Sequence, residues 1–178
     1  DTLAVLAGAA PLFFAGTGDE QTGNGDHAIY LYDETGKLTG SIPLAECCTD
    51  APYALDSDGT DYFLLFSDAV IRVGSDGTQL AKSGDMGGRP LQLACADNAV
   101  YVCVEGGRIY QTEKVVRLNA QTLEPEAELS CAGLDVQGMG TAADGTLLLI
   151  SGEYLLRPDF AAGTMTAILH WADNANTS

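Results

Sequence analysis

The chain has 178 residues, of which 25 are acidic and 8 are basic, and its net charge is −17. This charge repels phosphate backbones and anionic headgroups, so we expect no nucleic-acid partner. The length is sufficient for one domain with a buried core, and we treat residues 1–178 as a single domain.

The first predicted elements are two strands around a turn, in the uncharged run of residues 3–18. This run is too short to span a bilayer, and Gly8 and Pro11 interrupt it, so we expect no direct membrane insertion. The chain starts at Asp1 without an initiator methionine, from which we expect that a leader or an upstream region has been left out. The location of the protein therefore stays open at this point.

A glycine-rich polar loop follows at residues 17–27, with the sequence TGDEQTGNGDH. It contains no phosphate-binding glycine motif that leads into a helix. Irregular polar loops of this kind often carry binding residues on rigid scaffolds. The loop therefore supplies four candidate ligand-binding residues, which are Asp19, Asn24, Asp26 and His27.

From residue 28 onward, the pattern of an apolar strand, a polar turn and a second strand recurs four times. The segments begin at Ala28, Ala69, Lys114 and Glu153. Equivalent turn positions at Asp33, Gly74, Asn119 and Pro158 are separated by 41, 45 and 39 residues. A period of about 40 to 50 residues with four short strands is typical of a propeller blade.

The segments that precede these turns also repeat, each as a short strand, a tight turn and a strongly apolar strand. We expect the turns at Asp58-Gly59, Asp97-Asn98 and Asp144-Gly145, because such residue pairs tolerate positive φ between two apolar runs. Asp56, Asp58 and Asp61 form an acidic cluster at the first of these turns. Because the other repeats carry one aspartate in the same place, we interpret this cluster as turn geometry and not as a calcium loop.

The predicted fold is therefore all-β, with four propeller-blade-like antiparallel sheet repeats that form a β-propeller or part of one. We place the repeats at residues 1–46, 50–86, 88–132 and 135–171, followed by a tail at 172–178. Four repeats either close a small ring or belong to a larger one. We favour a monomer, with a ring-completing dimer as the alternative.

Two stretches, YDETGKLTGSIPL from Tyr32 and ILHWADNANTS from Ile168, carry a resemblance to a known group of proteins. The repeat region resembles the propeller-like regions of secreted solute-binding lipoproteins and other surface proteins of anaerobic bacteria. The resemblance implies an extracellular or cell-envelope location, a membrane tether and a role beside a transport or binding domain. No such companion domain lies within these 178 residues.

The sequence offers few residues for catalysis or metal binding. The five cysteines form no CxxC pair, and the two histidines, His27 and His170, lie far from any cysteine pair, so we expect no metal site, no cofactor and no disulfide framework. No GxSxG motif is present. Paired carboxylates of a carbohydrate-active enzyme, facing each other across a propeller cleft, are the remaining catalytic alternative.

The function that these observations favour is a non-catalytic binding or scaffold module, more consistent with a binding protein than with an enzyme. Its partner would be a protein or a glycan, held by blade loops on a rigid scaffold. Trp171 is a further candidate contact residue, although packing against the core or the tail is the favoured role for its ring. A carbohydrate-active enzyme and a self-assembly module are the alternatives.

Overall fold

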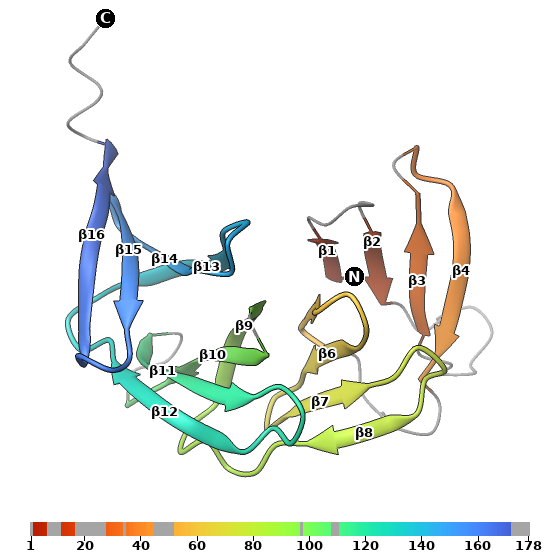
Figure 1. Cartoon of the computed structure of the whole chain (residues 1–178), viewed down its shortest axis with the longest axis horizontal. Helices are drawn as coiled ribbons and strands as arrows, with labels where there is room; N and C mark the ends of the chain where they lie inside the picture. Colours follow the sequence, from red (N-terminus) through yellow and green to blue (C-terminus); the bar gives the residue numbers. More distant parts are fainter. Residues whose placement is uncertain are drawn as a thin grey trace, which may run out of the picture. The chain divides into compact units, whose positions relative to one another are not determined.

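The computed structural model describes residues 2–6, 12–16, 28–33, 35–44, 52–96, 98–107 and 111–171 (Figure 1). These residues form sixteen strands and no α-helix, and every strand pairing is antiparallel. The predicted all-β class is therefore confirmed. No helix in this part of the chain has the length and apolar character needed to cross a membrane. The chain divides into two compact units, Asp1–Ser83 and Gly84–Ser178.

The first unit contains three sheets, of which two have two strands and one has four. β1 pairs with β2, β3 pairs with β4, and β5 to β8 follow one another in order. The strands are β1 (Thr2–Leu6), β2 (Leu12–Gly16), β3 (Ala28–Tyr32), β4 (Leu38–Pro43), β5 (Ala54–Ser57), β6 (Tyr62–Leu65), β7 (Val70–Val73) and β8 (Gln79–Lys82). Ile29 and Ile42 of the β3–β4 sheet pack with Leu64 and Val73 of the four-stranded sheet in one apolar core.

The second unit contains two four-stranded sheets, in which consecutive strands are neighbours. The strands are β9 (Pro90–Ala96), β10 (Ala99–Glu105), β11 (Thr112–Asn119), β12 (Pro125–Ser130), β13 (Val136–Thr141), β14 (Leu147–Ser151), β15 (Tyr154–Asp159) and β16 (Thr164–His170). Cys103 and Val115 of the first sheet share a buried core with Leu147, Leu149 and Leu156 of the second. The two sheets therefore pack face to face, as blades of a propeller do.

The three predicted Asp-Gly-type turns lie where the sequence places them, with Asp97 of the second turn outside the described residues. They join β5 to β6, β9 to β10 and β13 to β14. Gly59, Asn98 and Gly145 have φ values of 88°, 63° and 82°. Positive φ is costly for most residues, whereas glycine and asparagine adopt it readily. The backbone of these turns thus explains why these residue types recur.

The prediction that Pro158 lies in the fourth turn was wrong, because the turn begins two residues later. Pro158 lies inside β15, opposite Met165 of β16, and the turn follows at residues 160–163. A proline can occupy this strand position because β14 pairs with β15 only at Tyr154–Leu156. The missing N–H group of Pro158 therefore removes no hydrogen bond to β14.

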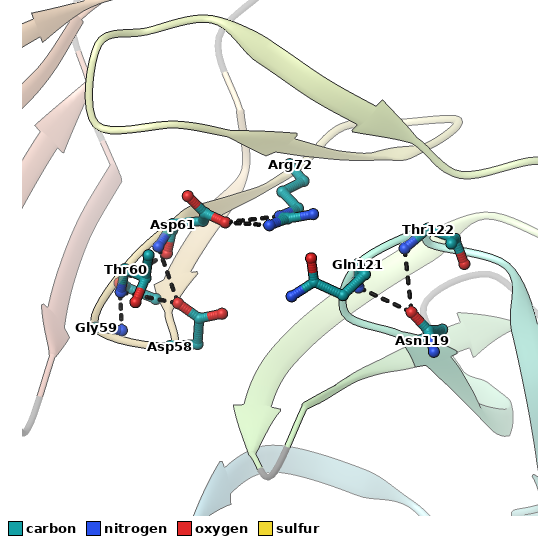
Figure 2. A network of polar contacts seen from close by, with 9 residues as sticks. Asp58, Gly59, Thr60, Asp61, Arg72, Asn119, Gln121 and Thr122 are labelled. Carbon is teal, nitrogen blue, oxygen red and sulfur yellow. Dashed lines mark hydrogen bonds and ion pairs between the residues drawn. The ribbon is translucent and has the colours of Figure 1, made fainter.

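Asp58 and Asp61 of the acidic cluster before β6 each make their own structural hydrogen bonds (Figure 2). The Oδ1 atom of Asp58 accepts hydrogen bonds from the backbone N–H groups of Thr60 and Asp61, both at 2.9 Å. Asp61 is almost fully buried, and its Oδ2 atom accepts hydrogen bonds from Nε and Nη2 of Arg72 on β7. These contacts support the interpretation of the cluster as a turn.

Candidate functional site

The predicted binding residues Asp19, Asn24, Asp26 and His27 lie outside the described residues, so their role stays a prediction. Trp171, the fifth candidate, directly follows β16 at the end of the last sheet. Its backbone N–H donates a hydrogen bond of 3.2 Å to the carbonyl oxygen of Glu153, and 37 % of its surface is exposed. Trp171 therefore belongs to the surface at the end of the last sheet, β13 to β16.

Large exposed hydrophobic side chains concentrate on this last sheet and the residue that follows it. Among the described residues, eight such side chains are exposed, and five of them belong to this region. They are Ile150, Tyr154, Ile168, Leu169 and Trp171. The other three, Leu38, Tyr53 and Leu80, are scattered over the first unit. Exposed apolar side chains that gather on one element typically mark an interaction surface, whereas single ones do not.

An aromatic and charged corner lies beside the turn between β14 and β15, where the register places Tyr154 and His170 on the same face of the sheet as Leu156. Tyr154 and His170 are cross-strand partners, and their rings stack with a centroid distance of 4.4 Å and an interplanar angle of 8°. The Nε2 atom of His170 lies 3.3 Å from Oε2 of Glu153. The stack and the polar contact together hold the imidazole in one orientation. The corner, defined as Glu153, Tyr154, His170 and Trp171, therefore presents flat rings and hydrogen-bonding groups to a partner.

A separate row of apolar residues crosses all four strands of the last sheet on the other face. The register pairs Gly138 with Ile150, Ile150 with Leu155, and Leu155 with Leu169. Side chains of cross-strand partners point to the same side of a sheet, and neighbours along a strand point to opposite sides. Ile150 and Leu155 follow and precede the core residues Leu149 and Leu156, so this apolar row lies on the face opposite the core.

Exposure along the apolar row is high for large aliphatic side chains. Ile150 is 39 % exposed and Leu169 is 44 % exposed, while Leu155 between them is half-buried. The terminal carbon of Ile150 lies over Gly138, where an added Cβ would be 3.5 Å away. Because Gly138 has no side chain, the β13 end of the row does not project from the sheet. The result is an apolar stripe to which another flat surface can pack.

The corresponding row of the adjacent β9–β12 sheet is buried, unlike the apolar row of the last sheet. In the β9–β12 sheet, Leu93, Val102 and Val116 are cross-strand partners on the face opposite the core that this sheet shares with β13–β16. Their exposed fractions are 8 %, 0 % and 2 %. Leu93, Val102 and Val116 are thus buried, whereas Ile150 and Leu169 of the last sheet are exposed.

Two thiols of the second unit, those of Cys103 and Cys131, are not suited to nucleophilic or metal chemistry. Burial raises the pKa of Cys103 to about 12, and the nearby Cys131 adds to this shift. Burial also raises the pKa of Cys131 to about 11. Both thiols are protonated at neutral pH, while nucleophilic attack and metal ligation require the thiolate. Within the described part of the chain, no three His, Cys, Asp or Glu residues are placed to hold a metal ion.

The sequence indicated Trp171 but neither the corner nor the apolar row. In the sequence, the segment TMTAILHW alternates between residues expected on two faces of a strand. In the structure, the register between β15 and β16 shifts between Leu155 and Leu156, and Ile168 is the extra residue on β16. Because one extra residue changes which side chains share a face, the outer face of β16 could not be assigned from alternation.

Comparison with known proteins shows the fold and no family. No family of known proteins matches the chain, and no curated protein matches it. Solved structures do match. Virginiamycin B lyase from Staphylococcus aureus matches with a TM-score of 0.57 and 16 % identity, over 93 % of this chain and 54 % of the lyase.

Two propeller-type domains match in the same way. The WD40 domain of Pan2 from Neurospora crassa has a TM-score of 0.60 and 10 % identity, over 93 % of this chain and 48 % of that one. The WD40 β-propeller domain of Doa1 has a TM-score of 0.58 and 9 % identity, over 92 % and 53 %. The chain thus spans about half the length of these structures. At such identities the likeness concerns the fold alone, and it fits part of a β-propeller.

Proposed function

We propose that this chain is a non-catalytic binding or scaffold module that engages another protein through the surface of its last sheet. The observation that carries the proposal is the exposure of Ile150 and Leu169 on the face of the last sheet opposite its core, with Tyr154, Ile168 and Trp171 also exposed on this sheet or directly after it. Interfaces are enriched in aromatic residues at their centres, and Tyr and Trp supply large contact areas at a small entropic cost.

The propeller fold supports this proposal without specifying a partner. Function resides in surface sites on a fold and not in the fold itself, so the exposed side chains and not the propeller class carry the proposal. The net charge of −17 disfavours nucleic acid and anionic lipid. The resemblance to surface proteins of anaerobic bacteria adds a proposed extracellular or cell-envelope location, in which the binding module accompanies a transport or binding domain.

Site-specific photo-crosslinking in cells that produce the chain tests this proposal. A photoreactive amino acid replaces Ile168, which is 46 % exposed on the last sheet, and in a matched control it replaces Leu80, which is 49 % exposed on β8. We expect a discrete protein adduct from position 168 and none from position 80. As a second readout, the single tryptophan of the chain, Trp171, should lose accessibility to iodide when the partner binds.

Two outcomes would contradict the proposal. The first is the absence of any protein adduct at position 168, and the second is an identical set of adducts at both positions. An adduct that glycosidases degrade would assign the surface to a glycan instead.

A further inference from the structure

β16 lies at the edge of the last sheet, and among the described strands only β15 pairs with it. It is the fourth strand of its sheet, as β8 and β12 are of theirs, so its edge position follows from the strand order within the sheet. Five of its seven residues are exposed and the other two are half-buried. An edge strand presents backbone N–H and C=O groups to which an extended segment can pair. Its side chains decide whether such pairing is opposed.

β16 lacks the residue types that protect the last strands of three other sheets. Its sequence, TMTAILH, contains no proline and no Asp, Glu, Lys or Arg. Proline and charged side chains on an edge strand oppose the addition of a further strand. The strands β4, β8 and β12 each contain at least one such residue, namely Pro43 in β4, Lys82 in β8, and Pro125, Glu126 and Glu128 in β12. Among these four strands, β16 is therefore the one that is open to strand addition.

The register identifies the backbone groups of β16 that point away from β15. Opposite residues of an antiparallel pair alternate between positions that exchange two hydrogen bonds and positions that exchange none. Pro158 lies opposite Met165 and has no N–H group, so this position exchanges none. Two residues along β15, Leu156 lies opposite Ala167, and this position exchanges none either. The N–H and C=O groups of Met165 and Ala167 therefore point outward from the sheet edge.

The other end of the strand pair agrees with this assignment. The N–H group of Trp171 donates a hydrogen bond to the carbonyl oxygen of Glu153, so Glu153 is one of the β15-side residues that bond toward β16. Leu156 lies three residues further along and falls between the bonded positions. The bulge at Ile168 ends the regular part of the edge. An added strand would therefore pair with Thr164–Ala167, with the exposed Ile168 directly beside it.

We propose that an extended segment of the partner protein pairs with residues 164–167 of β16 and adds a strand to the four-stranded last sheet. This inference rests on the proposed function, since it states how the same sheet binds its protein partner. In complexes of this kind, main-chain hydrogen bonds supply the affinity, and side chains at alternate positions supply the specificity. The outward N–H groups of Met165 and Ala167 are the donors that β16 offers.

The charge of the chain indicates the chemistry of the partner segment. The net charge of −17 repels acidic segments and attracts basic ones. A second copy of this chain carries the same charge and is disfavoured as the occupant. The partner segment should therefore be extended, basic and free of acidic side chains. Salt screens this attraction, so we expect weaker binding at high ionic strength.

Photo-crosslinking in cells from position 168 tests the proposal, because Ile168 lies beside the pairing segment and not within it. The variant Ala167→Pro removes an outward N–H group and leaves the hydrogen bonds to β15 in place. It should lower the yield of the protein adduct about tenfold or more. Ala167→Ser retains the N–H group and is the matched control, which should leave the yield unchanged.

A pair of charge variants tests the chemistry of the partner segment. Thr166 is exposed within the pairing segment. Thr166→Lys should lower the adduct yield by repulsion of a basic segment, whereas Thr166→Glu should retain it. The crosslinked protein, once identified by mass spectrometry and purified, should slow amide hydrogen exchange at Met165 and Ala167 when it is added to the unsubstituted chain.

Circular dichroism shows whether each variant is folded, and the exchange measurement decides the outcome if Ala167→Pro is not. Equal adduct yields from folded Ala167→Pro and Ala167→Ser, or unchanged exchange at Met165 and Ala167, would overturn strand addition and retain the binding module. A higher yield from Thr166→Lys than from Thr166→Glu, or an adduct between two copies of this chain, would overturn the basic partner segment. The absence of any adduct at position 168 would overturn both this inference and the proposed function.

Discussion

Removal of the Asp61 carboxylate should destabilise the first unit far more than removal of an exposed carboxylate from the same sheet. Asp61 and Arg72 form an ion pair whose side chains are only 10 % and 14 % exposed. Nε and Nη2 of Arg72 donate hydrogen bonds to Oδ2 of Asp61 (Figure 2), and the variant Asp61→Asn removes this counter-charge. A buried charge that loses its counter-charge is strongly unfavourable.

The structure supplies both the expected magnitude and a matched control. Breaking a buried pair by removing one partner costs about 3 kcal/mol or more. Asp68 and Lys82 lie 3.6 Å apart with 72 % and 48 % of their side chains exposed. Exposed pairs of this kind contribute about 1 kcal/mol or less, so Asp68→Asn should have a small effect. The two substitutions remove the same charge and differ mainly in burial.

Urea denaturation followed by circular dichroism measures the difference. With a slope of about 2 kcal/mol per molar urea, Asp61→Asn should lower the midpoint by about 1.5 M and Asp68→Asn by less than about 0.5 M. Adding Arg72→Met to Asp61→Asn should recover part of the loss, because it removes the guanidinium whose counter-charge is gone. Equal midpoints for the two single variants would refute the argument that burial makes the Asp61 pair important.

Two further predictions concern a glycine contact and the buried thiols. Gly77 has a φ of 86°, and a Cβ added there would overlap the carbonyl oxygen of Pro43, whereas Gly36, with a φ of 79°, has open space around it. Thermal unfolding should therefore show a loss for Gly77→Ala that exceeds the loss for Gly36→Ala by about 2 kcal/mol or more, and equal losses would contradict this reasoning. The raised pKa values of Cys103 and Cys131 mean that their contribution to stability is complete below about pH 9 and declines as the pH rises through 11 and 12. Urea unfolding between pH 8 and 11 should show a decline of up to about 1.4 kcal/mol per pH unit for each thiol, and an unchanged decline in Cys103→Ala would assign it to other groups.

Much of the fold could be predicted because its signals are local. A turn with positive φ requires glycine or asparagine at defined positions, so Gly59, Asn98 and Gly145 could be identified from residue type and spacing alone. The displaced fourth turn shows the limit of such signals. Pro158 resembles a turn residue in the sequence, yet the short pairing between β14 and β15 leaves room for it in a strand.

The candidate surface could not be predicted to the same extent. Ile150 and Leu149 are adjacent and chemically similar, but Leu149 is fully buried while Ile150 is 39 % exposed. Their difference depends on which face of the last sheet meets the β9–β12 sheet, and that depends on strand register and on contacts between residues distant in sequence. His170 likewise appeared as an isolated imidazole until the register placed it against Tyr154 and Glu153.

By itself, the sequence determined the strand class, the period of the repeats and the positions of the tight turns, because alternation and turn chemistry act over a few neighbouring residues. Only the tertiary structure decided that Asp61 pairs with Arg72, that Cys103 and Cys131 are buried, and that Ile150 and Leu169 share an exposed row. Each of these depends on packing between sheets, where burial is set by what lies opposite a residue and not by what lies next to it in the chain.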